Sequence, residues 1–250
     1  MSEGPERLRA RTAKPSRGYR TLDPEKIEGT LERLCRRVES RFPESGLSRV
    51  CRELHEIAGR TTATAAWIAR PILALRLSVA LLVGLILAGL LVTLAALRAP
   101  IEPLSFTDLV QTLEAGINDV VLLGAAIFFL ATLETRLKRR RALRAIHELR
   151  AIAHVIDMHQ LTKDPERVLE RGTHSGIVTV RPLTRFDLGR YLDYCSEALS
   201  LTGKVAALYI QNFDDPVALQ AVNEIEDLTT GLSRKIWQKL MVLYAMGPEG

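Results

Sequence analysis

The chain has 250 residues, 47% of them hydrophobic and 25% charged, with 34 basic and 29 acidic side chains. Three cysteines without CxxC spacing exclude a disulfide framework and a zinc signature and favour reduced, packed thiols: Cys35, Cys51 and Cys195. The charge is unevenly distributed, because residues 99–133 contain four acidic residues and no Lys or Arg, whereas residues 1–76 contain 16 basic and 10 acidic ones. A segment without basic residues between basic flanks is typical of membrane insertion.

Residues 1–21 are basic and rich in Pro, Gly and Ser, and we expect them to be disordered. No apolar run follows them, so we do not expect them to be a secretory signal peptide. Residues 22–70 predict two amphipathic cytoplasmic helices. The first opens at Asp23 and Pro24 and has apolar residues at intervals of three and four, and the second covers about 47–69.

A first membrane span is predicted at 77–97. Its 21 residues carry no charge and are bracketed by Arg76 and Arg98. At 1.5 Å per residue this helix is about 31 Å long, which matches the roughly 30 Å hydrocarbon core of a bilayer. A buried helix of a soluble protein would need a large surrounding structure to cover it on all sides. Trp67, near Arg70, is expected to lie at the interface where the span begins.

A row of small side chains recurs every four residues along this span: Ala80, Gly84 and Ala88. Such a row allows another helix to approach closely. Three alternatives stay open. The row packs against the second span, where Gly124 and Ala125 are candidates, or against a neighbouring copy of the chain, or it arises by chance in a segment rich in Ala and Gly.

The second predicted span, residues 114–133, is less uniform. Its last 14 residues are uncharged but reach only about 21 Å, so the polar residues before them must also enter the membrane or its headgroup zone. Residues 98–113 then form an extracytoplasmic loop, in which Ser105 and Asp108 have the spacing of a capping box that opens the second helix. Residues 71–135 together predict a two-helix transmembrane hairpin.

Polar side chains form a stripe at the start of the second span: Gln111, Glu114 and Asn118, with Asp119 on the adjacent face. Repeated around a ring of subunits, an acidic stripe would attract cations to a water-filled mouth, as acidic rings do in cation channels. The alternative, which we favour, places these residues in the headgroup zone, where they form hydrogen bonds with water or lipid.

Basic residues cluster directly after the second span: Arg136, Lys138, Arg139, Arg140, Arg141 and Arg144. Arg150 follows, and three arginines precede the first span, whereas the connecting loop offers only Arg98. The positive-inside rule therefore predicts that both termini lie in the cytoplasm. The cluster is interpreted as a topology anchor that also binds anionic lipid headgroups. Nucleic acid is not an expected partner, because no aromatic residue interleaves the cluster.

Residues 136–250 predict a cytoplasmic helical domain. The helix of the second span continues to about residue 161, because neither Gly nor Pro interrupts its pattern. A short helix is expected at 164–172, and the segment HSGIVTV, residues 174–180, is the only strand-like run.

Two further helices complete this domain. Thr184 and Asp187 have the spacing of a capping box, and Asp215 and Pro216 open the last helix. Each helix has one apolar face, so the two are expected to form an antiparallel hairpin that packs on the other cytoplasmic helices.

The strongest candidate for chemistry is the segment HELRAIAHVIDMH. His147 and His154 share one helix face with Asp157, but the two imidazoles are about 10 Å apart along the axis and cannot bind one ion directly. Structural histidines near headgroups or in the bundle are the favoured interpretation. None of the GxSxG, HExxH, GxxxxGK[ST] or GxGxxG sequences occurs. The pair His154 and Asp157 could bind an ion only with ligands from elsewhere in the chain, and this alternative stays open. We predict no enzyme, cofactor or metal site.

The sequence predicts an all-α integral membrane protein with a transmembrane hairpin and a cytoplasmic bundle built from the N- and C-terminal segments. The favoured function is a self-associating, membrane-anchored helical scaffold or signalling adaptor that docks a cytoplasmic protein. The alternative is a subunit of a homo-oligomeric cation channel lined by the second span. Free cysteines on the predicted inner side and short loops fit a bacterial inner membrane.

Overall fold

The computed structural model describes residues 21–98, 106–165 and 183–245. Within these ranges every regular element is an α-helix, which confirms the predicted all-α class. The helices are α1 Pro24–Arg41, α2 Gly46–Ala69, α3 Leu73–Arg98, α4 Phe106–Leu161, α6 Arg185–Leu208 and α7 Pro216–Ala245. The predictions for the N-terminal tail, for Ser105, and for nearly all of the short helix and strand-like run at 164–180 lie outside the described residues.

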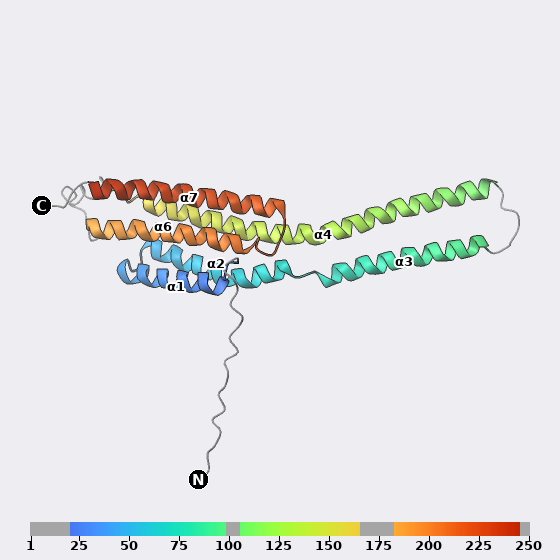
Figure 1. Cartoon of the computed structure of the whole chain (residues 1–250), viewed down its shortest axis with the longest axis horizontal. Coiled ribbons are helices and arrows are strands. Elements are labelled where there is room, and N and C mark those ends of the chain that lie inside the picture. Colours follow the sequence, from blue (N-terminus) through green and yellow to red (C-terminus); the bar gives the residue numbers. More distant parts are fainter. Residues whose placement is uncertain (1–20, 99–105, 166–182, 246–250) are drawn as a thin grey trace, which may run out of the picture.

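Five helical segments form an elongated bundle, from which two helical arms project side by side (Figure 1). The arms are α3 and the first half of α4. In the bundle, α1 packs on α2 and α6, while the second half of α4 packs on α2, α6 and α7, and α6 packs on α7. The N- and C-terminal segments of the chain therefore both contribute to one bundle.

Side-chain caps define three of the helix starts. The Asp23 carboxylate accepts a hydrogen bond from the Glu25 amide at 3.1 Å, which caps α1. The Thr184 hydroxyl accepts from the Asp187 amide at 3.1 Å and donates to its carboxylate at 2.7 Å, so this predicted capping pair is confirmed at the start of α6. Ser45, which the sequence did not single out, caps α2 in the same way.

The apolar faces of the bundle helices meet in one buried core. The apolar faces of α1, α6 and α7 are buried or partly buried, but two apolar residues in the second half of α4 are exposed: Leu137 at 43% and Val155 at 36%. The buried face of α4 instead follows Lys138, Ala142, Ile146, Leu149, Ala153 and Ile156. Each of the two exceptions is rotated by about 100° from its neighbour on that face.

Close contacts connect the start of the chain to its later helices. A Cβ atom on Gly46 would lie 2.0 Å from Cε1 of His159, so a larger residue at the start of α2 would require the His159 side chain at the end of α4 to move. In the core, the hydroxyls of Thr61 and Tyr209 share a hydrogen bond of 2.9 Å. These contacts hold the N-terminal helices on the C-terminal ones.

Candidate membrane anchor and its junction with the bundle

The two arms expose apolar side chains along most of their described length. On α3 these are Leu73, Leu77, Leu81, Leu85, Leu87, Leu91 and Val92, and on α4 they are Ile117, Val120, Val121, Leu122, Phe128 and Phe129, each more than half exposed. Among the residues that the structure describes, two helices are long and apolar enough to cross a membrane. Soluble monomers rarely expose contiguous apolar patches of more than a few hundred Å². The arms are therefore the candidate membrane anchor.

The facing sides of the arms carry mainly large apolar residues. Half-buried positions include Leu75 and Val79 on α3 and Leu130 on α4. Ala80, Gly84 and Ala88 are exposed, as are Gly124 and Ala125, and a Cβ atom added to Gly84 or Gly124 would meet nothing within 4 Å. The small-residue row does not pack on the second arm in this structure, so contact with another copy of the chain and chance occurrence are the two alternatives that stay open.

The structure places the polar stripe near the end of α4 that is remote from the bundle. Glu114 and Asn118 are exposed there. Gln111 and Asp119 belong to the same helix, but their side chains lie outside the described part of the structure. The helical spacing that was predicted for the stripe is therefore present in the backbone.

Glu134 joins the start of α3 to α4 at the junction with the bundle. Pro71 separates α2 from α3, and the amide of Ile72 donates to Glu134 Oε1 at 3.2 Å. The same carboxylate accepts from Lys138 Nζ at 2.7 Å and from Arg76 Nε at 3.5 Å. Sequence reasoning missed this residue, although an acid four positions before a lysine on a helix is a recognisable pair.

Arg139 binds the start of α7. Its Nε and Nη2 atoms donate to the two carboxylate oxygens of Asp215 at 2.8–3.1 Å, and the side chain of Asp215 is only 1% exposed. Asp215 also accepts from the Ala218 amide at 2.9 Å and so caps α7. Burial alone would raise the pKa of this carboxyl, but the hydrogen bonds from Arg139 and the amides outweigh it and hold the pKa below its ordinary value.

The predicted basic cluster therefore divides into two sets. Lys138, 8% exposed, and Arg139 are engaged inside the molecule, whereas the remaining arginines are exposed. The guanidinium of Arg141 lies 4.1 Å from the ring centroid of Trp67 at the end of α2. A groove of about 410 Å³ is lined by Trp67, Leu137, Arg140, Arg141 and Arg144, while Arg136 lies outside it.

The histidine-rich segment shows no metal centre. His147 and His154 are exposed, and the Asp157 carboxylate accepts a 2.6 Å hydrogen bond from the Gln160 amide. Among the described residues no three His, Cys, Asp or Glu side chains are placed to hold a metal ion. Cys51 and Cys195 are buried free thiols, and burial raises the pKa of Cys195 to about 12.

Comparison with known proteins adds no family to this description. No protein-family model matches the chain, and no curated protein or solved structure is significantly similar to it. The function is therefore inferred from the residues and the geometry of the chain itself.

Proposed function

We propose that this chain is an integral membrane protein that acts as a membrane-anchored helical scaffold or signalling adaptor. The observation that supports this most directly is the single helix α4. Its first half exposes apolar side chains, and its second half contributes core residues to the bundle. One uninterrupted helix thus joins the apolar arms to the bundle, so the bundle would sit at a fixed place beneath the membrane.

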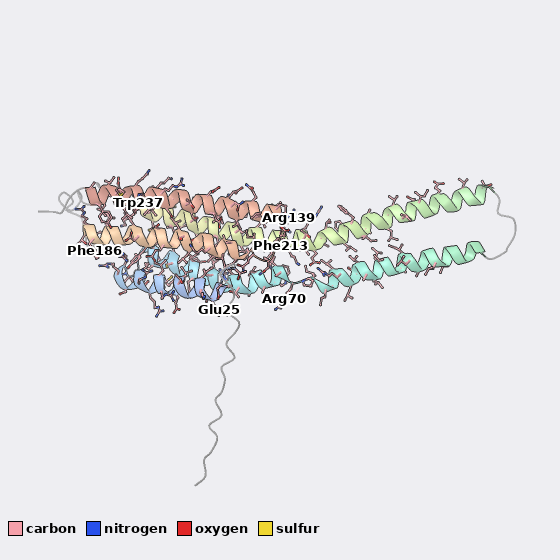
Figure 2. All side chains as sticks on the ribbon, viewed as in Figure 1. Glu25, Arg70, Arg139, Phe186, Phe213 and Trp237 are labelled. Carbon is pink, nitrogen blue, oxygen red and sulfur yellow. The ribbon has the colours of Figure 1, made fainter. Side chains whose placement is uncertain are left out.

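The charges around the junction support the orientation with both termini in the cytoplasm. The exposed arginines of the cluster directly follow the apolar half of α4 in sequence, and Figure 2 shows their neighbour Arg139 where the arms meet the bundle. Basic residues remain preferentially on the cytoplasmic side during insertion. Burying the exposed leucines and phenylalanines of the arms in lipid contributes about 25 cal/mol per Å² of apolar surface removed from water.

The far half of the bundle carries the surface that suits a docking role. Phe186 on α6 and Trp237 on α7 are 65% and 62% exposed, and both lie in the half of the bundle remote from the arms (Figure 2). Met241 and Tyr244 extend the Trp237 position along one side of α7 at helical spacing. Exposed aromatic residues are enriched in protein interfaces.

The second candidate function is a subunit of a homo-oligomeric cation channel. It is supported by the exposure of Glu114 and Asn118 on an otherwise apolar arm. Several copies would have to assemble for this stripe to enclose a water-filled path.

Three measurements test the proposal. Alkaline carbonate should leave the full chain in the membrane pellet, and protease added outside sealed cells should spare both ends. Release by carbonate, or trimming of the C-terminal helices from outside, contradicts the anchor. Cation flux through liposomes containing the purified chain separates the two functions. A scaffold gives no flux, whereas flux that the Glu114→Ala, Asp119→Ala double variant abolishes would replace the scaffold with the channel.

A further inference from the structure

We propose that the groove lined by Trp67, Leu137, Arg140, Arg141 and Arg144 binds the phosphate-bearing headgroup of an anionic phospholipid. The inference rests on the proposed membrane anchoring. It assigns to one groove the binding of anionic lipid headgroups that the sequence predicts for the whole basic cluster. The groove has a volume of about 410 Å³ and is open to the surface.

The charges of the three arginines in the groove are not compensated by a carboxylate among the described residues. Arg140, Arg141 and Arg144 are exposed, and in the part of the chain that the structure describes none of them forms an ion pair. Lys138 and Arg139, which lie between Leu137 and Arg140 in sequence, are neutralised by Glu134 and Asp215. Guanidinium groups bind phosphate oxygens through paired, charge-assisted hydrogen bonds. The fold therefore pairs two basic side chains of the cluster with carboxylates inside the molecule and leaves the three arginines of the groove exposed.

Trp67 makes the groove more than a patch of charge. Its ring is 38% exposed and lies 4.1 Å from the guanidinium carbon of Arg141, which is cation–π geometry. This contact orders Arg141 before any ligand arrives, so less side-chain entropy is lost on binding. Tryptophan side chains also favour the headgroup level of a bilayer, where the indole N–H can reach a polar partner.

The position of the groove fits a lipid better than a soluble ion. Arg140 lies seven residues after the predicted end of the span, about 10 Å along the helix axis. Its side chain leans back toward the membrane, because Cα–Cβ bonds tilt toward the N-terminus of a helix and α4 runs from the arms into the bundle. Leu137, 43% exposed, lies on the arm side of the arginines and offers apolar contact to the glycerol backbone and first methylenes.

The test uses the full chain with Trp237→Phe, which leaves Trp67 as the only tryptophan. The protein is reconstituted in phosphatidylcholine vesicles containing a fixed fraction of phosphatidylglycerol, and one of the two lipids carries brominated acyl chains that quench indole fluorescence. We expect at least fivefold preferential association of phosphatidylglycerol with Trp67. The Arg140→Gln, Arg141→Gln, Arg144→Gln triple variant should lower this preference to about one.

A matched control removes the same charge elsewhere. Arg49, Arg52 and Arg234 are exposed on the bundle away from the groove, and their triple Gln variant should retain the preference. Replacing the three groove arginines by Lys should restore part of it, which separates loss of charge from misfolding. Equal quenching by both lipids, an unchanged groove variant, or equal loss in the control overturns the site.

These outcomes are distinguishable from failure of the anchor. If carbonate leaves every variant in the pellet while lipid preference is absent, the anchor stands and the headgroup site is wrong. If carbonate releases the parent protein, both are wrong. Inorganic phosphate or a duplex oligonucleotide that removes the preference at constant ionic strength would assign the groove to soluble phosphate or to nucleic acid, and would overturn the lipid assignment.

Discussion

Leucine occupies opposite environments in the two regions of this molecule. Leu81 and Leu85 on the α3 arm are 77% and 70% exposed, whereas Leu31 and Leu34 on α1 are fully buried in the bundle. The difference lies in what surrounds them in sequence. α1 alternates apolar and charged residues at helical spacing, so it has a face for water, whereas α3 carries no charge between Arg76 and its last residue. A helix without a polar face needs apolar surroundings on all sides.

The largest effect should come from placing charge on the exposed leucines of the arm. Leu81→Asp with Leu85→Asp should prevent stable insertion, because each acid near the middle of a span costs about 3 kcal/mol on insertion scales. The protein remaining in membranes after carbonate extraction measures this. The control is Trp237→Asp with Met241→Asp, two exposed apolar residues of the bundle. Equal retention of both variants would show that the arms and the bundle surface lie in the same environment, and would contradict burial of the arms in lipid.

The next effect sharpens the comparison by removing methylene groups from each region. Leu54→Ala, at a fully buried position of α2, should lower the free energy of unfolding by about 2–5 kcal/mol because it leaves a cavity. Leu81→Ala should change it by less than about 0.5 kcal/mol, because no protein core surrounds that side chain. Urea unfolding in detergent, followed by near-ultraviolet circular dichroism, tests both. A comparable loss for Leu81→Ala would place protein packing around the arm.

A smaller effect is expected where the two regions join. Asp215→Asn should lower the free energy of unfolding by about 1–3 kcal/mol, since it weakens the cap of α7 and the pair with Arg139. The lower part of this range is expected because the Arg139 side chain is 35% exposed and can be solvated when the pair is lost. Asp214→Asn, an exposed neighbour, is the control and should have little effect.

The same pair gives a pH dependence with a defined sign. The pKa of Asp215 is lowered in the folded state, so its stabilising contribution is complete above the unfolded-state pKa of about 3.9 and is lost as the pH falls through the lower folded value. The stability difference between the parent and Asp215→Asn should therefore be constant near neutral pH and shrink below about pH 4. A difference that grows on acidification would contradict the bonding described for this carboxylate.

Sequence patterns predicted the features that depend on neighbouring residues. Asp23 and Thr184 cap their helices as expected, and α4 continues past the span to Leu161, because no Gly or Pro follows Gly124 in this helix. Contacts between distant segments were not predictable in this way. The bonds from Arg139 to Asp215 and from Ile72 to Glu134 join helices through positions that no local periodicity connects.

The internal engagement of Lys138 is a second example of this limit. In sequence it is one member of a basic run, and only its position on the inner side of α4, beside Glu134, distinguishes it from exposed Arg140. The exposure of Leu137 has the same origin, because the buried face of α4 includes residue 138 and not residue 137. A run of like charges thus indicates where a surface lies but not which of its members face it.

The break at Pro71 has a consequence for how the proposed spans would respond to bilayer thickness. A span longer than the lipid is thick relieves the mismatch by tilting. α3 is separated from α2 at Pro71, where the Ile72 amide donates to the Glu134 carboxylate, whereas α4 continues into the bundle without interruption. Tilting of the first span would be absorbed at the proline, and tilting of the second would turn the whole bundle with it. Only one of the two spans would therefore report membrane thickness to the cytoplasm.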